Sequence, residues 1–422
     1  MTFARRVAYL IAALVISLYL IINIRSSNYR ATFQELSQKV GLGELIDDEE
    51  YETQQQTDPS RQPITINQGA LRNGSSRVFP VGAVKRPGET YTRALVIGRL
   101  STENTTWLES YSTTDETLTP YLYVVDDVRA PLHTPLNKGH EAMVYLTYII
   151  DHYDDPAMPD VVIFMHPHQL AWHTPELLNH DAEEALKRLS SERVVREGYM
   201  NLRCHWDPGC PERLHPGNSL RDNLKREEIA LAAAWAELFV DDPIPEAIGA
   251  PCCAQFAVSR ERIRATPKKH YQKYRDWLIR TEESDWISGR VFEYLWHKIF
   301  TDHAQLCPDA RACYCDGYGI CFESDNLFNA WFRDHFYWSK SVKELEKWDE
   351  QAAYVNSIGD WDKIEHMNIN IPSPGRNLEL KEDIQIRFER LVKLRTAALK
   401  NGTDPQLRAA VAQRPWQAGD GY

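Results

Sequence analysis

The sequence lacks several short motifs that identify common enzyme classes. It has no Walker-type Gly-rich loop, no Gly-x-Ser-x-Gly elbow, no His-Glu-x-x-His pair and no internal repeat. These absences argue against P-loop nucleotide hydrolases, serine hydrolases of the α/β class, zinc proteases of that type and repeat proteins. An excess of positive charge is missing too, since 48 Lys and Arg stand against 60 Asp and Glu, for a formal net charge of −12. That balance argues against a general nucleic-acid binder.

Cysteine is absent from most of the chain, and all eight cysteines lie between residues 204 and 321. An even number of clustered cysteines predicts disulfide bonds in an oxidising compartment. Three Asn-x-Ser/Thr sequences, at Asn73, Asn104 and Asn401, are candidate glycosylation sites and agree with that compartment. We therefore expect a glycoprotein whose body lies in the lumen of the endoplasmic reticulum or Golgi.

The spacing of the cysteines leaves their pairing open. The run Cys307–Cys321 holds four of them and is typical of a disulfide knot or a zinc site, but it lacks the paired Cys-x-x-Cys of common zinc modules. Cys204 and Cys210 bracket an Asp-Pro-Gly turn that a disulfide would close. The adjacent Cys252 and Cys253 are not expected to bond with each other, because a disulfide needs more widely separated backbones.

The N-terminal segment Val7–Ile24 is almost wholly apolar. Its length suits a single transmembrane helix, with residues 1–6 as a short cytoplasmic tail. A cleaved signal peptide is the alternative, but its apolar core is usually shorter. Residues 25–90 are rich in polar residues and proline, which predicts a disordered stem. These features indicate a single-pass membrane protein with a signal anchor.

The body, residues 91–322, alternates between strand and helix patterns. Arg93–Arg99 and Tyr121–Asp127 are expected to be strands, Asn137–Asp151 a helix with Asn137 as its N-cap, and Val161–Met165 a buried strand. This order predicts an α/β fold, with a Rossmann-like mixed sheet flanked by helices.

Further elements follow along the chain. Residues 323–422 are expected to be an aromatic and helical extension that frays beyond Asn401. Strands are expected at 198–206 and 248–259, and helices at 220–240, 271–281, 284–300 and 378–400.

Two strand ends carry polar residues that suit a binding site. His166 and His168 follow Val161–Met165, and Asp126 and Asp127 end an earlier strand. Ligands in open α/β sheets bind at the carboxyl ends of strands, so these residues are candidate ligands of a metal or a nucleotide. The alternative is that they are ordinary polar residues of loops and turns.

The expected helix 284–300 carries a carboxylate beside aromatic side chains. Glu293 and His297 lie one turn apart next to its apolar face. Apolar surroundings raise the pKa of a carboxyl group, which would suit a general base. The alternative is an exposed glutamate paired with Arg290.

Several motifs together resemble a family of fungal, membrane-anchored proteins that share a domain of unknown function. The resemblance covers Tyr91 to Phe322. The motifs that carry it are Tyr123-Val-Val-Asp-Asp, Asn137-Lys-Gly-His-Glu, Asp160-Val-Val-Ile-Phe-Met-His, Trp172-His, Asn201-Leu-Arg-Cys and Gly289-Arg-Val-Phe-Glu-Tyr-Leu-Trp-His.

A looser resemblance is to glycosyltransferases of the GT-A fold. Val161–Met165 occupies the place of their metal-binding strand, and Arg290–Trp296 looks like their later helix that contributes a carboxylate near the acceptor. The resemblance implies a nucleotide-sugar donor, a glycan acceptor and a divalent ion such as Mn²⁺. The sequence departs from the family by having His166-Pro-His168 where Asp-x-Asp is expected, and carboxylates suit such ions beside phosphate better than imidazole does.

These observations lead to a hypothesis of sugar transfer. Arg99, Asp126 and Asp127, with His166 and His168, would cradle the nucleotide, and Glu293 would deprotonate an acceptor hydroxyl. The alternatives are a metal-dependent hydrolase and a non-catalytic lumenal scaffold protein with a decayed transferase fold.

Overall fold

The computed structural model describes residues 79–216, 226–367 and 369–422, and all of them belong to one compact unit, Ile66–Tyr422. None of the helices in these ranges is long and apolar enough to cross a membrane. The expected anchor Val7–Ile24, most of the expected stem and Asn73 lie outside them.

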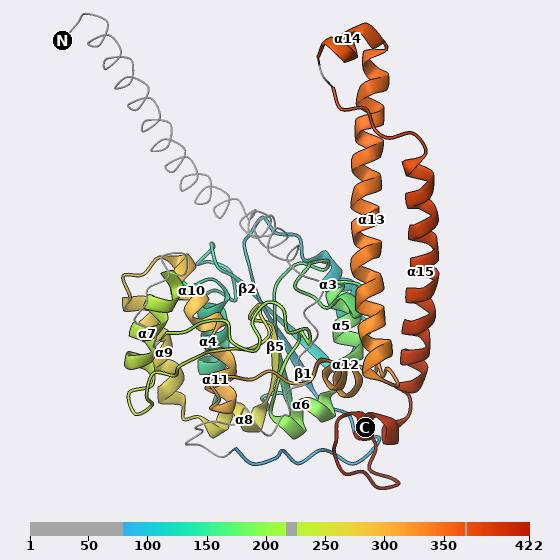
Figure 1. The fold of residues 1–422 in the computed structure, drawn as a ribbon. Coiled ribbons are helices and arrows are strands. Elements are labelled where there is room, and N and C mark those ends of the chain that lie inside the picture. The colour runs from blue at the N-terminus through green and yellow to red at the C-terminus, as the bar shows by residue number, and fades with distance from the viewer. Residues whose placement is uncertain (1–78, 217–225, 368) are drawn as a thin grey trace, which may run out of the picture. The chain divides into compact units, whose positions relative to one another are not determined.

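The described chain alternates strands and helices, as the sequence predicts, and ends in helices alone (Figure 1). In chain order the elements are β1 (Arg93–Arg99), α3 (Thr106–Ser112), β2 (Leu118–Val124), α4 (Glu141–His152), β3 (Val161–Met165), η1 (Glu176–Leu178), α5 (Ala182–Arg188), α6 (Ser191–Glu197), β4 (Tyr199–Asn201), α7 (Arg226–Leu238), β5 (Phe256–Ser259), α8 (Arg260–Ala265), α9 (Lys268–Arg280), α10 (Asp285–Glu293), α11 (Trp296–Thr301), α12 (Ala310–Tyr318), α13 (Asp325–Ile358), α14 (Trp361–His366), α15 (Arg376–Asn401) and α16 (Pro405–Val411).

The five strands form one mixed sheet in the order β2-β1-β3-β5-β4. β1 pairs in parallel with both β2 and β3, whereas β5 runs antiparallel to β3 and to β4. β4 therefore runs in the same direction as β1, β2 and β3. The carboxyl ends of these four strands share one edge of the sheet, and β5 begins at that edge.

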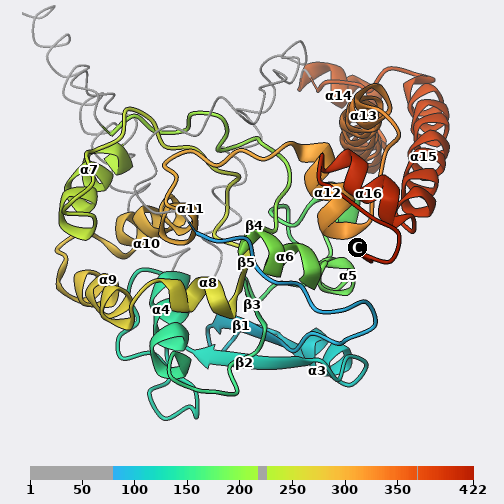
Figure 2. The same cartoon turned by 90° about the horizontal axis from the view of Figure 1, so that it is seen from below.

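Each face of the sheet packs against its own set of helices (Figure 2). Val162 and Phe164 of β3 belong to the core with α4, α7, α9, α10 and α11, while Val161 and Ile163 belong to the core with α5, α6 and α12. Every residue of β3 is buried. This burial on both faces explains why the strand has no polar alternation.

The central strands confirm the sequence prediction, but the flanking boundaries differ. β1 and β3 have the expected bounds, and β2 lies three residues earlier than expected. Helix α4 begins at Glu141, so the expected N-cap at Asn137 is wrong. Gly139 (φ 74°) and His140 (φ 49°) have left-handed backbone that turns the chain before the helix can start. The expected strands at 198–206 and 248–259 shorten to β4 and β5.

The expected helix 284–300 is interrupted. Helix α10 ends at Glu293 and α11 begins at Trp296. The Leu295 N–H donates to the carbonyl of Phe292 at 2.9 Å, a tighter turn than an α-helix makes. Glu293 and His297 consequently do not share one helix face.

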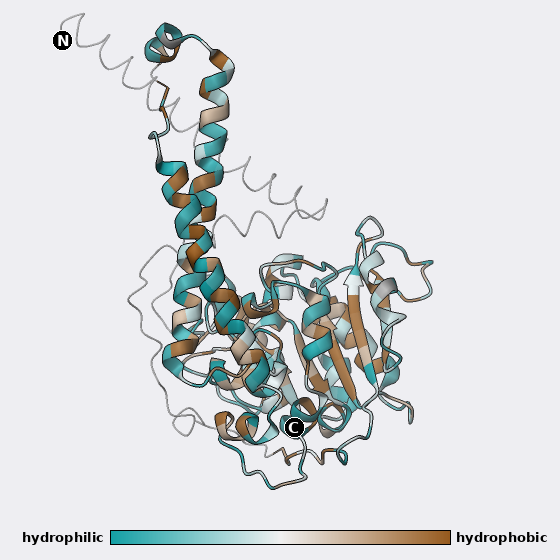
Figure 3. Ribbon diagram, turned by 90° about the vertical axis from the view of Figure 1, so that its right-hand side faces the viewer, coloured by the Kyte–Doolittle hydropathy of each residue, from teal (hydrophilic) through white to brown (hydrophobic). Residues whose placement is uncertain are grey.

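The C-terminal helices α13 and α15 lie side by side (Figure 1), and apolar and polar positions alternate along both of them (Figure 3). Arg395 of α15 binds Glu184 of α5 at 2.8 Å and so ties the pair to the α/β layers. The expectation that the chain frays beyond Asn401 is wrong, because α16 packs against α12. Its Arg408 is buried and donates to the carbonyl of Asp316 at 2.6 Å.

All eight cysteines form disulfides, which corrects two expectations. Cys204 and Cys210 do not bond to each other, and the adjacent Cys252 and Cys253 do. The pairs are Cys204–Cys313, Cys210–Cys307, Cys252–Cys253 and Cys315–Cys321.

The disulfides should differ in their contribution to stability. In a background that already lacks Cys210–Cys307, which is nested inside it, the Cys204→Ala/Cys313→Ala change opens a link of sequence separation 109, and we expect the free energy of unfolding to fall further, by about 3–5 kcal/mol. The matched Cys315→Ala/Cys321→Ala variant opens a link of separation 6 and should lose about 2 kcal/mol. Urea unfolding of the oxidised variants measures both, and equal losses would contradict the loop-entropy argument.

Candidate functional site

The carboxyl edge of the sheet gathers five segments that the sequence separates widely. The register pairs Ile97 with Met165, Phe164 with Phe256 and Asn201 with Phe256, so the ends of β1, β3 and β4 lie beside the start of β5. The loops after β1, β2, β3 and β4 and the segment before β5 therefore meet there. This is where ligands bind in open α/β sheets.

His166 is the first residue after β3. Its backbone N–H donates to Oε1 of the buried Gln255 at 3.1 Å. Its ring meets that of the buried His173 edge-on, with centroids 4.5 Å apart. His166 also interacts electrostatically with the carboxyl group of Glu141. The imidazole is thus held between another histidine and an acid.

Glu141 is a site residue that the sequence analysis missed. It occupies the first turn of α4, which starts at the same edge of the sheet. Burial raises the pKa of its carboxyl group, His166 and His140 oppose that rise, and the negative charge of Glu293 adds to it. The sequence signal was the Gly139-His140-Glu141 run, where a turn and an acid precede an apolar helix.

Gly289 lets α10 approach this turn closely. A Cβ at that position would come within 2.7 Å of Cδ2 of His140. Residue 289 can approach the turn this closely because it has no side chain. Glu141 interacts electrostatically with Glu293, at the end of this helix, as well as with His166. Such a set of groups can accept and release a proton.

Glu293, the last residue of α10, has both carboxylate oxygens engaged. Oε1 accepts from the backbone N–H of Cys253 at 3.1 Å, and Oε2 binds Arg290 at 2.9 Å. The side chain is 13% exposed. The Arg290 partner that the sequence suggested is present, but the pair is largely covered and both oxygens of the carboxylate are held.

The segment Cys252–Gln255 supplies the backbone N–H that Glu293 binds. Cys253 (φ 87°) and Ala254 (φ 50°) both have left-handed backbone, which is rare for residues with a side chain. Asn201 anchors the start of this segment by donating to the carbonyl of Pro251 at 2.6 Å. No sequence pattern predicted this conformation.

The predicted nucleotide-binding residues lie at the same edge but are engaged in local turns. Arg99 Nη1 donates to the carbonyls of Leu100 and Glu103, each at 3.2 Å. Asp126 accepts from the N–H and hydroxyl of Ser101, each at 2.8 Å. Asp127 binds Arg129 at 3.3 Å. The strand ends are thus brought together, and the Asp127 carboxylate pairs within its own loop.

The two predicted metal ligands have different neighbours. His168 lies 3.6 Å from Glu103, whereas His166 lies against His173. Across the described ranges, no three His, Cys, Asp or Glu side chains are grouped so that they could hold a metal ion. The side chains around His166-Pro-His168 therefore do not fit a divalent metal centre.

His297 lies away from this site, in the core. It is 1% exposed, and Nε2 lies 2.9 Å from the carbonyl of Ala304. Burial lowers its pKa to about 4, so the ring is neutral at physiological pH. The break between α10 and α11 is what separates it from Glu293.

A second polar cluster, also missed by the sequence analysis, lies under the loop after β3. Glu176 binds Arg203 at 3.3 Å, and Arg203 also donates to the carbonyl of Trp172 at 2.8 Å. Burial alone would raise the pKa of Glu176, but Arg203, with His205 next, lowers it to about 2. The cluster fixes the loop that carries His173 to the end of β4.

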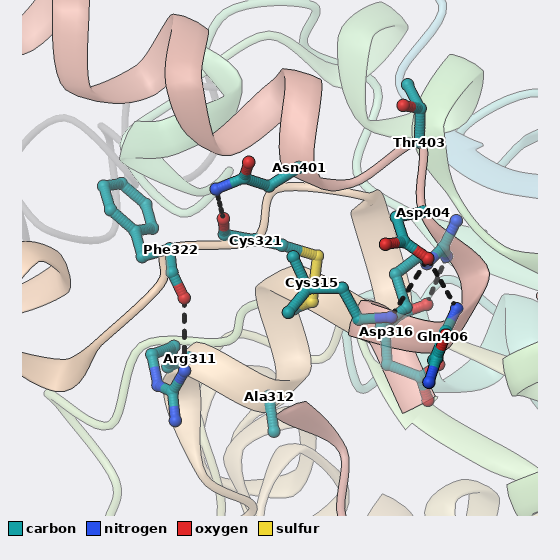
Figure 4. Close-up of a disulfide and its surroundings, with 12 residues drawn as sticks. Arg311, Ala312, Cys315, Asp316, Cys321, Phe322, Asn401, Thr403, Asp404 and Gln406 are labelled. Atoms are coloured by element: carbon teal, nitrogen blue, oxygen red, sulfur yellow. Dashed lines mark hydrogen bonds between the residues drawn. A yellow bond between two sulfur atoms is a disulfide. The ribbon is translucent and has the colours of Figure 1, made fainter. Parts of the chain in front are cut away.

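The two candidate glycosylation sites in the described chain differ in geometry. Asn104 is exposed, and its Oδ1 accepts from the Thr106 hydroxyl at 2.8 Å. Asn401 is half-buried at the end of α15, and its Nδ2 donates to the carbonyl of Cys321 at 3.2 Å beside the Cys315–Cys321 disulfide (Figure 4). Only Asn104 presents its amide nitrogen as an acceptor site would.

A family model described as "Protein of unknown function (DUF3431)" matches residues 95–316, which is more than half of the chain. The chain belongs to this family. The match begins within β1 and ends within α12, so it includes His166, Glu141 and Glu293. Neither the curated proteins nor the solved structures contain a match.

Acid should destabilise the protein through Glu176. The pKa of Glu176 is lower in the folded chain than the ordinary 4.5 of a glutamate. Its charge therefore stabilises the fold above pH 4.5, and this contribution is lost as the pH falls toward about 2. Glu176→Gln should remove about 3 kcal/mol at neutral pH and flatten the acid limb of urea unfolding. A Glu109→Gln control on the exposed surface of α3 should change neither. If the free energy of unfolding of Glu176→Gln still fell at acid pH as it does in the unaltered protein, the assigned role of Glu176 would be wrong.

Glycosylation should use Asn104 and spare Asn401. When the protein is expressed in a secretory pathway, Asn104→Gln should remove one glycan, because the exposed amide is the acceptor. The matched Asn401→Gln variant should keep the same glycan mass. Mass spectrometry of the intact protein before and after deglycosylation tests this, and a glycan lost from Asn401→Gln would show that its folded hydrogen bond does not protect it.

Proposed function

We propose that this protein is a glycosyltransferase whose active site lies at the carboxyl edge of the sheet. The observation that carries the proposal is that Glu141 of α4 lies at the carboxyl edge of the sheet and interacts electrostatically there with His166, the first residue after β3, and with Glu293 of α10. The mixed sheet suits the GT-A resemblance, β3 has the place of the strand before the donor site, and α10 brings a carboxylate to the same edge.

In the proposed reaction, an acceptor hydroxyl oxygen attacks the anomeric carbon of a nucleotide sugar and the diphosphate leaves. The acceptor proton passes to Glu141 rather than to Glu293, the residue that the sequence suggested. The reason is that the pKa of Glu141 is raised by burial and by the charge of Glu293, and a base with a raised pKa accepts protons more readily. Glu293, held by Cys253 and Arg290, serves as a fixed negative charge.

Charge on the leaving diphosphate needs cationic partners. His166 and the exposed His140 lie beside the carboxyl pair, and Arg99 lies at the end of β1. These groups suit that role by electrostatic stabilisation. Because the histidines do not gather as a metal site, the proposed mechanism includes no step through a metal.

We also propose that the protein works in the lumen of the Golgi or endoplasmic reticulum, anchored by Val7–Ile24. Four disulfides and the acceptor geometry at Asn104 support an oxidising, glycosylating compartment. The non-catalytic alternative is supported by one observation, the engagement of Arg99 and Asp126 in local hydrogen bonds.

Nucleotide sugars should stabilise the purified protein. A donor at about a hundred times its Kd should add about 2.7 kcal/mol to the free energy of unfolding. Thermal unfolding with a panel of nucleotide sugars, each with Mn²⁺ or with EDTA, is the measurement. We expect one nucleotide class to raise the unfolding temperature by the same amount with Mn²⁺ and with EDTA, because the proposed mechanism uses no metal. No shift with any nucleotide would favour the scaffold alternative, and a shift with a metal ion alone would favour a hydrolase.

The two carboxyl groups should respond differently once a donor is known. Glu141→Gln should reduce turnover by about 10²- to 10⁴-fold, because it removes the base. Glu293→Gln should keep measurable turnover and move the acidic limb of the pH profile to lower pH, since the pKa of Glu141 falls when the neighbouring charge is removed. An unmoved limb with an equal loss in Glu293→Gln would make Glu293 the base instead.

A further inference from the structure

The segment Cys252–Gln255 connects the two sides of the proposed active site. At one end the N–H of Cys253 donates to Glu293 at 3.1 Å, and at the other the side chain of Gln255 accepts from the N–H of His166 at 3.1 Å. Asn201 holds the segment's start through the carbonyl of Pro251. The backbone of this segment therefore positions the Glu293 carboxylate at one end and the N–H of His166, the first residue after β3, at the other.

The disulfide within this segment has a local effect rather than a global one. Cys252 and Cys253 are neighbours in sequence, whereas Cys204–Cys313 and Cys210–Cys307 span separations of 109 and 97. The entropy that a disulfide removes from the unfolded chain grows with the loop it closes, so this pair contributes little by that route. The Cys252–Cys253 disulfide acts instead on the folded protein. The small ring that it closes restricts the backbone that carries the Cys253 N–H.

The left-handed backbone of Cys253 and Ala254 makes that restriction important. Residues with a side chain leave the left-handed region readily unless the surrounding structure holds them there. The bond between the two sulfur atoms is one such constraint, and the hydrogen bond to Glu293 is another. Breaking the first leaves the second to hold the segment alone.

We propose that Cys252–Cys253 is a thiol–disulfide exchange site whose reduction releases Glu293. The proposal deepens the function proposed above by naming a regulation of that same site, and its effect on turnover rests on that function. The co-substrate it would take is a dithiol reductant. Cys252 is partly exposed and Cys253 is buried, so attack is expected at the sulfur of Cys252.

The exchange proceeds in two balanced steps. A thiolate of the reductant bonds to Sγ of Cys252, the bond between the two cysteines breaks, and Cys253 leaves as a thiolate that takes up a proton. The second thiol of the reductant then attacks the reductant sulfur that is bonded to Cys252. The mixed disulfide breaks, and Cys252 leaves as a thiolate that is protonated in turn. Two electrons pass to the protein, and the reductant becomes a cyclic disulfide.

Reduction should change the active site without unfolding the protein. The Cys253 N–H is then no longer fixed on Glu293, and the carboxylate keeps only Arg290 as its partner among those identified above. The charge that strengthens Glu141 as a base moves, so turnover would fall. Reoxidation should restore both the Cys253–Glu293 hydrogen bond and turnover.

The test is hydrogen exchange on the full-length protein, titrated with dithiothreitol and mapped by differential alkylation. When Cys252 and Cys253 become alkylatable, exchange at the amide of residue 253 should accelerate about tenfold or more, as expected for loss of a charged hydrogen bond. Exchange in β3 should stay unchanged. An unchanged rate at residue 253 after the pair is reduced overturns the proposal.

Two variants serve as matched controls. Cys210→Ser/Cys307→Ser removes the other partly exposed disulfide and should leave the response of residue 253 to reductant intact. Cys252→Ser/Cys253→Ser should show the fast exchange without reductant and no further response. If residue 253 instead responds only when Cys210–Cys307 can be reduced, the proposal is overturned.

The exchange measurement needs no nucleotide, so the two proposals can fail separately. If hydrogen exchange at residue 253 became faster on reduction but the protein bound no nucleotide sugar, the exchange-site proposal would stand and the transferase proposal would be wrong. If the protein bound a nucleotide sugar but exchange at residue 253 did not change on reduction, the transferase proposal would stand and the exchange-site proposal would be wrong.

Discussion

The antiparallel pairing of β5 with β3 is the constraint on which the rest of the site depends. A parallel strand in that position would enter from the opposite edge of the sheet. Because β5 runs the other way, the segment before it arrives where β1, β2, β3 and β4 end. That arrangement places the Cys253 N–H on Glu293 and the Gln255 side chain on the backbone of His166. The helices then need only begin or end at this edge to complete the site.

Two half-buried glutamates show how neighbours determine the chemistry of a carboxyl group. Burial raises the pKa of both Glu141 and Glu176. Glu176 has the guanidinium of Arg203 beside it, so its pKa falls to about 2 and it stays charged as part of the scaffold. At Glu141 burial is the largest effect and the imidazoles of His166 and His140 oppose it only in part, so its pKa stays raised. The first arrangement stabilises a loop, and the second prepares a group for proton transfer.

The sequence predicted the centre of the fold better than its site. β1 and β3 could be located because a short, continuous apolar run has few alternatives in an α/β domain. Glu141 was missed because the start of α4 depends on left-handed backbone at Gly139 and His140, which helix patterns do not reveal. The same patterns predicted one helix where the structure has α10 and α11, and so placed Glu293 and His297 on one helix face. The bond between Cys252 and Cys253 was missed because it rests on a backbone turn that only tertiary contacts hold.

The central claim is that Glu141 is a proton-transfer group because burial and the charge of Glu293 act on it together. The most direct measurement is the pKa of Glu141 by carbon NMR of carboxyl-labelled protein, with Glu141→Gln to assign the signal. We predict a pKa above the ordinary 4.5 of a glutamate and a lower pKa in Glu293→Gln. A pKa at or below 4.5 that does not change in Glu293→Gln would contradict the account.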